Sequence, residues 1–299
     1  MLPPSPLQRL HHPAAAAAGV ALYCKRDDLY RFAVGSPLQG NKIRKLAPYL
    51  PAAADLRGRT FVSFGGAYSN HLAALSAAGR RFGFATRFYV RGEAVSNPTL
   101  DYLRRSGSEL HFISRTAYRR KTDPSFLSSL NLGEKDLLIP EGGSTPAALP
   151  HAGAVFSETV DALDRPPDVF CLSAGTGCTA AAIAIAAAPY PTSVEVFPAL
   201  RDDWMREEIE RWMPTGVSRE RLRVVEDYAF GGYGKFPSSW QLTTPPGALA
   251  KRAEIGESGL PPLEPVYTAK LFAGVLDRLR KGQYSRGSTL VVYHSGGIY

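Results

Sequence analysis

Short apolar runs alternate with amphipathic stretches along almost the whole chain. Runs such as 60–64, 85–90 and 168–172 are rich in Val, Phe, Tyr and Leu, and each is followed closely by glycine. The stretches between them, such as 71–82, repeat apolar residues at helical spacing. Strands that alternate with helices predict a mainly parallel sheet covered on both faces, and therefore an α/β fold.

The same pattern predicts two domains. The expected strands are 20–26, 60–64, 85–90, 109–113, 136–139, 168–172, 193–197, 221–225 and 289–293, and the expected helices are 42–50, 71–82, 97–106, 150–164, 180–188, 202–213 and 268–281. Because 47–155 carries a strand–helix series of its own, we expect a smaller domain there. Residues 1–46 and 156–299 would then build a larger, discontinuous domain.

Composition narrows the class of protein. The chain has 299 residues, is 44% hydrophobic and 21% charged, and carries a net charge of +8 without a basic block that would indicate nucleic-acid binding. No apolar run reaches transmembrane length, and the first residues lack the features of a signal peptide. Cys24, Cys171 and Cys178 lack metal-ligand spacing, so we expect no metal site, reduced thiols, a cytoplasmic location and no membrane partner.

The first candidate for chemistry is Lys42. The turn-prone pair Gly40-Asn41 precedes it, and Ile43 and Leu46 follow at helical spacing, so Lys42 stands at a predicted helix start. The positive end of the helix dipole disfavours an ammonium there and lowers the pKa of the amine. A neutral amine is what attack on a carbonyl requires. The alternative is an ordinary solvated lysine.

A second candidate is the glycine-rich turn 173–179. It joins a buried strand to a helix, where backbone N–H groups and the hydroxyls of Ser173, Thr176 and Thr179 can bind a phosphate. Two alternatives stay open at this point. One is a plain tight turn, and the other is a dinucleotide fingerprint in which Gly175, Gly177 and Ala180 combine with Glu195.

Residues 65–71 form another loop at a strand end. Ser69 can act as a hydroxyl acid–base group, and Asn70 can donate to a phenolate or a carboxylate. The alternative is that both only cap the following helix, and we expect His71 to pack or to cap. Tyr233 and Tyr267, taken alone, are as compatible with core or surface positions as with catalysis.

Seven short motifs follow one another along the chain in an order that resembles one enzyme family. They are Lys-Arg-Asp-Asp-Leu (25–29), Gly-Asn-Lys-x-Arg-Lys-Leu (40–46), Gly-Gly-x-x-Ser-Asn-His (65–71), Glu-Gly-Gly (141–143), the 173–179 turn, Pro-Val-Tyr-Thr-x-Lys (265–270) and His-Ser-Gly-Gly (294–297). The set resembles the pyridoxal-phosphate enzymes of the 1-aminocyclopropane-1-carboxylate deaminase and D-cysteine desulfhydrase family. The resemblance implies the two-domain fold type II of the tryptophan-synthase-β-like enzymes. It also implies a reaction of the lyase or hydrolase class.

The resemblance also implies roles for individual residues. Lys42 would form the Schiff base with pyridoxal 5′-phosphate and move the Cα proton, with Ser69, Tyr233 and Tyr267 as the other catalytic residues. The cofactor-binding residues would be Lys42, Lys45, Asn70, Ala174, Gly175, Thr176, Gly177, Cys178, Thr179 and Ser295. Asn70 would bind the cofactor phenolate and 174–179 its phosphate, while Lys45 would neutralise the phosphate or serve as a second amine.

Departures from the family pattern bear on the substrate. Thr268 stands where the cyclopropane deaminases carry a glutamate, and Ser295 stands where they carry a leucine. Losing that carboxylate removes the group expected to protonate the pyridine nitrogen, which suits β-elimination better than ring opening. The sequence therefore favours a lyase that converts a small D-amino acid such as D-cysteine to pyruvate and ammonia, in a homodimer. The alternatives are a cyclopropane deaminase, a non-catalytic pyridoxal-phosphate-binding protein and, least favoured, a dinucleotide oxidoreductase.

Overall fold

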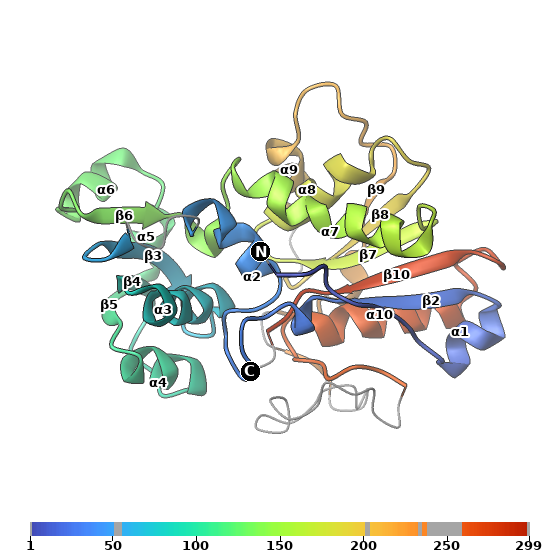
Figure 1. The fold of residues 1–299 in the computed structure, drawn as a ribbon, viewed down its shortest axis with the longest axis horizontal. Helices are drawn as coiled ribbons and strands as arrows, with labels where there is room; N and C mark the ends of the chain where they lie inside the picture. Colours follow the sequence, from blue (N-terminus) through green and yellow to red (C-terminus); the bar gives the residue numbers. More distant parts are fainter. Residues whose placement is uncertain (1, 51–55, 201–203, 233–234, 238–258, 298–299) are drawn as a thin grey trace. The chain divides into compact units, whose positions relative to one another are not determined.

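The computed structural model describes residues 2–50, 56–200, 204–232, 235–237 and 259–297. The chain divides into a larger unit, formed by Met1–Gly35, Gln39–Asn41 and Leu149–Tyr299, and a smaller unit, formed by Ser36–Leu38 and Lys42–Ala148. Each unit is built around a mainly parallel sheet with helices packed on it (Figure 1). The α/β class predicted from the alternating pattern is confirmed.

The larger unit holds a six-stranded sheet in the order β1-β2-β10-β7-β8-β9. Its strands are β1 (Leu7–Arg9), β2 (Ala21–Arg26), β7 (Val169–Ala174), β8 (Ser193–Pro198), β9 (Leu222–Val224) and β10 (Thr289–His294). All neighbouring pairs are parallel except β1 with β2. This antiparallel edge strand was not predicted, because three residues are too short to show an alternating pattern.

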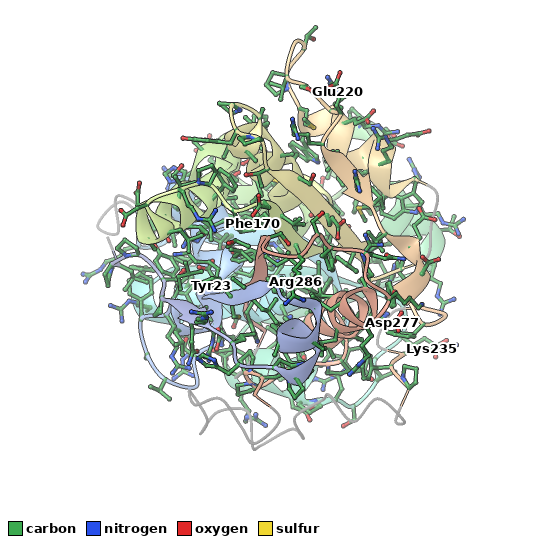
Figure 2. The ribbon with its side chains drawn as sticks, turned by 90° about the vertical axis from the view of Figure 1, so that its right-hand side faces the viewer. Tyr23, Phe170, Glu220, Lys235, Asp277 and Arg286 are labelled. Atoms are coloured by element: carbon green, nitrogen blue, oxygen red, sulfur yellow. The ribbon has the colours of Figure 1, made fainter. Side chains whose placement is uncertain are left out.

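Helices cover both faces of this sheet. They are α1 (Pro13–Ala18), α7 (Ala148–Leu163), α8 (Cys178–Ala187), α9 (Met205–Trp212) and α10 (Thr268–Arg280), with single 3₁₀ turns η1 (Asp27–Leu29) and η5 (Glu226–Tyr228). On β10, Leu290 and Val292 pack in the core formed with α1 and α10, whereas Val291 and Tyr293 pack in the core formed with α7, α8 and α9. Phe170 of β7, labelled in Figure 2, belongs to the second core. Successive residues therefore alternate between two apolar layers, as a strand buried on both sides requires.

The smaller unit holds a four-stranded, fully parallel sheet in the order β5-β4-β3-β6. Its elements are α2 (Asn41–Leu46), η2 (Ala47–Tyr49), β3 (Thr60–Gly66), α3 (Asn70–Phe82), β4 (Ala85–Arg91), α4 (Pro98–Arg105), β5 (Glu109–Ile113), α5 (Arg115–Arg119), α6 (Pro124–Ser129), β6 (Asp136–Ile139) and η4 (Glu141–Gly143). Val62, Phe64, Tyr89 and Tyr118 form its aromatic core on the side of α5 and α6. Helix α3 packs against β3 and β4.

The division between the units lies elsewhere than at the expected positions after residues 46 and 155. Most of α2 belongs to the smaller unit, where the Lys45 ammonium binds Ser144, and α7 belongs to the larger unit, where Val155 and Phe156 join the sheet core. Long-range contacts of this kind are not visible in a local sequence pattern.

Two further observations concern the described residues. None of their helices is both long and apolar enough to cross a membrane. All three cysteines, Cys24, Cys171 and Cys178, are buried and unpaired as thiols. The predicted cytoplasmic location and homodimer stay predictions.

Candidate active site

In the larger unit, the carboxyl end of β7 leads into the glycine-rich turn. Ser173 and Ala174 are the last residues of the strand, and α8 begins at Cys178, two residues before the predicted start. Gly177 sets that start, because its φ of 70° is left-handed and a Cβ there would lie 3.2 Å from the backbone of α9. The turn therefore needs glycine at this position and leads directly into the helix.

The turn has the electrostatics of an anion site. No side chain caps α8 at Gly177, and the first turn of this ten-residue helix carries no acidic residue. The Oγ atom of Ser173 is buried and has no hydrogen-bond partner among the residues that the structure describes. The Cys178 N–H donates to the Thr176 carbonyl at 2.8 Å. The features that fit a phosphate group are therefore the positive end of the helix dipole and the buried Ser173 hydroxyl. These features agree with the phosphate interpretation of the turn, which stays a prediction.

The dinucleotide alternative is not supported by the position of Glu195. This residue lies within β8 and is 2% exposed. Its carboxylate accepts hydrogen bonds from the Arg278 guanidinium and from the Tyr284 hydroxyl, both at 2.9 Å. Burial raises the pKa of Tyr284, which keeps that hydroxyl a donor. A carboxylate engaged in this way is not available to bind a ribose.

Tyr267 lies beside the turn. Its Oη atom is 3.1 Å from the position that a Cβ on Gly175 would take, so glycine leaves room for the phenol. The Tyr267 backbone N–H donates to Glu264 at 2.8 Å, and this anchors the residue at the start of α10. The structure therefore brings Tyr267 and the turn together. Tyr233, the other predicted tyrosine, lies outside the described residues.

Ser295 lies in a turn that holds the chain just before Lys42. The Ser295 carbonyl accepts the Asn41 N–H at 3.0 Å. Gly40 has a φ of 62°, and a Cβ there would lie 2.2 Å from that same carbonyl oxygen. His294 fixes the turn, since its Nδ1 accepts the Gly296 N–H at 3.3 Å and its Nε2 donates to a backbone carbonyl. Lys42 is the next residue in the chain after Asn41.

In the smaller unit, Lys42 and Lys45 stand one turn apart on α2, so the predicted helix start is present. Lys45 is 1% exposed and donates to the Ser144 hydroxyl at 2.8 Å. Burial, followed by the charges of Lys42 and Lys45, holds the pKa of His71 well below its usual range. The charges of both amines therefore act on the same buried imidazole. The lowered pKa predicted for Lys42 itself stays a prediction.

The hydrogen bonds of His71 fix its tautomer. The Ser63 hydroxyl donates to the Ile139 carbonyl at 2.7 Å, so its oxygen accepts from His71 Nε2 at 2.8 Å. The other ring nitrogen, Nδ1, is then an unprotonated acceptor, and within the described part of the chain it has no hydrogen-bond partner. The sequence interpretation gave His71 only a packing or capping role and missed this buried acceptor. Only the contact with Ser63, which is distant from the loop motif, reveals it.

Ser69 and Asn70 lie at the start of α3. The Ser69 Oγ accepts the Leu72 N–H at 3.3 Å, so the expected capping interaction is present. Asn70 is the first residue of the helix and is half-buried. Both therefore stand at the carboxyl end of β3, the edge of a parallel sheet at which ligands bind.

Hydrogen bonds at the start of α10 show what Thr268 does at the position where the cyclopropane deaminases carry a glutamate. Glu264 accepts the backbone N–H groups of Val266, Tyr267 and Thr268 at 2.7 to 2.8 Å. The Thr268 hydroxyl in turn accepts the Glu264 N–H at 2.9 Å. Burial raises the pKa of Glu264 even though these N–H groups favour its ionised form. The threonine and the glutamate thus bind each other and cap the helix.

Comparison with known proteins identifies the family. The model of the family described as "Pyridoxal-phosphate dependent enzyme" matches residues 2–222. A candidate 1-aminocyclopropane-1-carboxylate deaminase of Thermotoga maritima is 32% identical and matches 100% of this chain and 95% of its own length. A candidate deaminase of the same name from Pyrococcus horikoshii is 28% identical, over 94% of this chain and 85% of its own.

A solved structure agrees in fold. The crystal structure of a homologue of this deaminase superposes with a TM-score of 0.78 at 24% identity, covering 99% of this chain and 90% of its own. The comparisons favour a deaminase or lyase, so the expected class of hydrolase is wrong. The chain belongs to the family of pyridoxal-phosphate-dependent enzymes, the family that its sequence motifs resemble, and its cofactor is pyridoxal 5′-phosphate.

Proposed function

We propose that the enzyme eliminates a β-leaving group, such as sulfide, from a small D-amino acid and releases pyruvate and ammonia. The observation that carries this proposal is the engagement of Thr268 and Glu264 with each other at the start of α10. The carboxylate at this helix start is bound to backbone N–H groups, and a hydroxyl stands where cyclopropane deaminases have their acid. A pyridine ring that is not held protonated by an acid withdraws electrons less strongly, which suffices for loss of a good leaving group.

Different residues would bind different parts of the cofactor. Lys42 would be the amine that holds the cofactor through its aldehyde, and Asn70 would donate to its phenolate. The start of α8, with the hydroxyls of Ser173 and Thr179, would bind the phosphate, because the positive end of a helix dipole favours anions. Lys45 adds positive charge from a buried position. When bound, the cofactor supplies an electron sink for the pair released from Cα.

Two side chains are assigned to proton transfer, and a third, Ser69, to binding the substrate carboxylate. The Lys42 Nζ would accept the Cα proton of the bound substrate. Ser69 Oγ, which accepts one N–H at the start of α3, still has its proton to donate to a substrate carboxylate. Tyr267 Oη, beside Gly175, delivers a proton to the departing group.

The test measures products from purified enzyme with its cofactor. D-cysteine, β-chloro-D-alanine and D-serine should yield pyruvate, while 1-aminocyclopropane-1-carboxylate should yield little 2-oxobutanoate. Lys42→Ala is the control for cofactor-dependent turnover, and Tyr267→Phe should lower kcat about tenfold or more with a smaller change in KM. Release of 2-oxobutanoate as the main activity would establish the deaminase named for the relatives. Absence of any product would refute catalysis on these substrates.

A further inference from the structure

The charged side chains of the 25–29 motif are buried at the end of β2, and the roles assigned above do not use them. Arg26 donates to both carboxylate oxygens of Asp28, at 2.8 and 2.7 Å. Asp27 is fully buried and accepts a hydrogen bond from the hydroxyl of Tyr293 on β10, which is also fully buried. Burying a carboxyl group costs free energy unless it is hydrogen-bonded. The contact between Asp27 and Tyr293 therefore has to form for the strand ends to pack as they do.

This hydrogen bond joins the ends of two neighbouring strands. Strands β2 and β10 are parallel and lie side by side in the sheet of the larger unit (Figure 1), and their last paired residues are Arg26 and His294. Asp27 lies one residue beyond that pair on β2, and Tyr293 lies one residue before it on β10. The side-chain hydrogen bond thus continues the connection between the two strands past the last backbone pair.

Each of the two strand ends supplies one backbone carbonyl to the segment before Lys42. After β2, the Tyr30 carbonyl accepts the Gly40 N–H at 2.9 Å. After β10, the Ser295 carbonyl accepts the Asn41 N–H at 3.0 Å. Two consecutive N–H groups are therefore held by carbonyls from two different strand ends. Both hydrogen bonds can form only while the two ends keep their spacing.

The two carbonyls are tied to the side-chain hydrogen bond through short stretches of chain. The Tyr30 N–H donates to the Asp27 carbonyl at 3.0 Å and closes the 3₁₀ turn η1, so a fixed Asp27 also fixes the Tyr30 carbonyl. Ser295 is two residues after Tyr293. The imidazole of His294, which lies between them, is itself fixed, because it donates to a backbone carbonyl at 2.7 Å.

The segment held in this way is the point at which the chain passes into the smaller unit. Gln39–Asn41 belong to the larger unit, and Lys42 begins the long segment of the smaller one. The backbones are in close contact, since a Cβ on Gly296 would lie 3.3 Å from the Gly40 Cα. A change in the spacing of the strand ends is therefore passed on to Gly40 and the residue after it, because touching backbones cannot absorb it.

We propose that Asp27 and Tyr293 are positioning residues for Lys42. Their hydrogen bond holds the ends of β2 and β10 at the spacing at which the Tyr30 and Ser295 carbonyls can bind the two residues before Lys42. For its effect on the cofactor the proposal rests on the proposed function, in which Lys42 is the amine that holds the cofactor. For its effect on the backbone it rests on the hydrogen bonds alone. The experiments separate these two parts.

The first experiment measures amide hydrogen exchange in the cofactor-loaded enzyme. Tyr293→Phe removes only the hydroxyl that binds Asp27 and keeps the ring that packs in the core. We expect exchange of the Gly40 and Asn41 amides to increase about tenfold, with exchange in β4 unchanged. Unchanged exchange at both amides, or an equal increase throughout the chain, would overturn the proposal.

Tyr284→Phe is the matched control. Tyr284 is also a buried tyrosine of the larger unit, and its hydroxyl donates to the buried carboxylate of Glu195 at 2.9 Å. Losing that hydroxyl should lower the free energy of unfolding about as much as Tyr293→Phe does, but exchange of the Gly40 and Asn41 amides should stay as in the wild type. An equal increase at these two amides in both variants would indicate a general loss of stability and would contradict the positioning role.

The second experiment asks whether the two side chains act through each other. In an Asp27→Ala background the Tyr293 hydroxyl has already lost this acceptor. Adding Tyr293→Phe there should raise exchange of the Gly40 amide less than about threefold, against about tenfold when it is made in the wild type. Equal factors in both backgrounds would overturn the role given to the hydrogen bond.

The third experiment connects the backbone to the cofactor. In an absorbance titration the dissociation constant of pyridoxal phosphate should rise about fivefold or more in Tyr293→Phe and should be unchanged in Tyr284→Phe, because only the first loosens a prepared binding residue. Faster exchange at Gly40 with an unchanged dissociation constant would contradict the positioning of Lys42. If reduction with borohydride places the cofactor on a lysine other than Lys42, the proposed function fails, whereas the exchange result still decides whether the strand ends hold this segment.

Discussion

Replacing Gly40 by alanine tests whether the turn before Lys42 requires a glycine, with its left-handed φ and its close approach to the Ser295 backbone. Gly40 has a φ of 62°, and its N–H donates to the Tyr30 carbonyl at 2.9 Å. A Cβ would lie 2.2 Å from the Ser295 oxygen and 2.8 Å from the Ser295 carbonyl carbon. Both atoms belong to backbone, which cannot rotate away as a flexible side chain can.

The expected loss of stability has three parts. Placing an alanine in the left-handed region costs about 1 kcal/mol. Moving the two backbones apart by about 1 Å breaks the hydrogen bond from Asn41 N–H to Ser295, which contributes about 1 kcal/mol. Displaced packing around the turn adds about 1 kcal/mol, by analogy with overpacked sites. We therefore expect Gly40→Ala to lower the free energy of unfolding by about 3 kcal/mol.

The assay compares urea unfolding and cofactor binding in two variants. Gly35→Ala is the matched control, because Gly35 has a φ of 73° and an added Cβ would have nothing within 4 Å. It should lose only the conformational part, about 1 kcal/mol, and bind pyridoxal phosphate normally. Gly40→Ala should also bind the cofactor more weakly, since Lys42 is two residues away. Equal losses of stability in the two variants, with equal cofactor binding, would refute the reasoning.

Three further predictions concern buried charges. Lys45→Met should raise the dissociation constant of pyridoxal phosphate about tenfold or more in an absorbance titration, because it removes a buried cation; an unchanged constant would exclude a role in binding. Glu195→Gln should lower the free energy of unfolding in urea by about 3 kcal/mol, because it leaves Arg278 with a neutral partner, and the cofactor should bind as before. Loss of cofactor binding without loss of stability would contradict the structural role of Glu195. Burial opposes ionisation of Asp28, but its interactions with His294 and with the Arg26 guanidinium, which donates to both carboxylate oxygens, outweigh burial and lower the pKa of Asp28. Because the pKa of Asp28 is lower in the folded state than in the unfolded state, its ionisation stabilises the fold at pH values above the unfolded-state pKa. This stabilisation is lost as the pH falls through the folded-state pKa. In Asp28→Asn the free energy of unfolding should therefore fall less steeply as the pH drops below about 4. The same steepness as in the wild type would contradict this.

Local signals were sufficient for most of the fold. The apolar runs predicted the parallel strands, and Ser69 and Asn97 cap α3 and α4 as their side chains favour. The signal was weaker at α8, where the predicted start at residue 180 missed Cys178 and Thr179. Gly177 ends the turn there in a left-handed conformation, which a single glycine in a glycine-rich stretch does not indicate.

The contacts that define the site come from residues far apart in the chain. Lys45 meets Ser144, Tyr293 meets Asp27, and the Ser295 carbonyl meets Asn41. A sequence pattern states which residue types are present but not which of them meet in the fold. The helix α1 was missed for a related reason, because five successive alanines show no apolar periodicity.

The central claim is that Lys42 is the amine that bonds the cofactor. Lys45 is the informative rival, because it stands on the same helix one turn later and is also buried. The direct measurement is reduction of the purified, cofactor-loaded protein with borohydride, followed by proteolysis and mass spectrometry of the modified peptide. The phosphopyridoxyl mass should be found on Lys42 and should be absent from this peptide in Lys42→Ala. The same mass on Lys45 in the wild type, or no modified peptide at all, would contradict it.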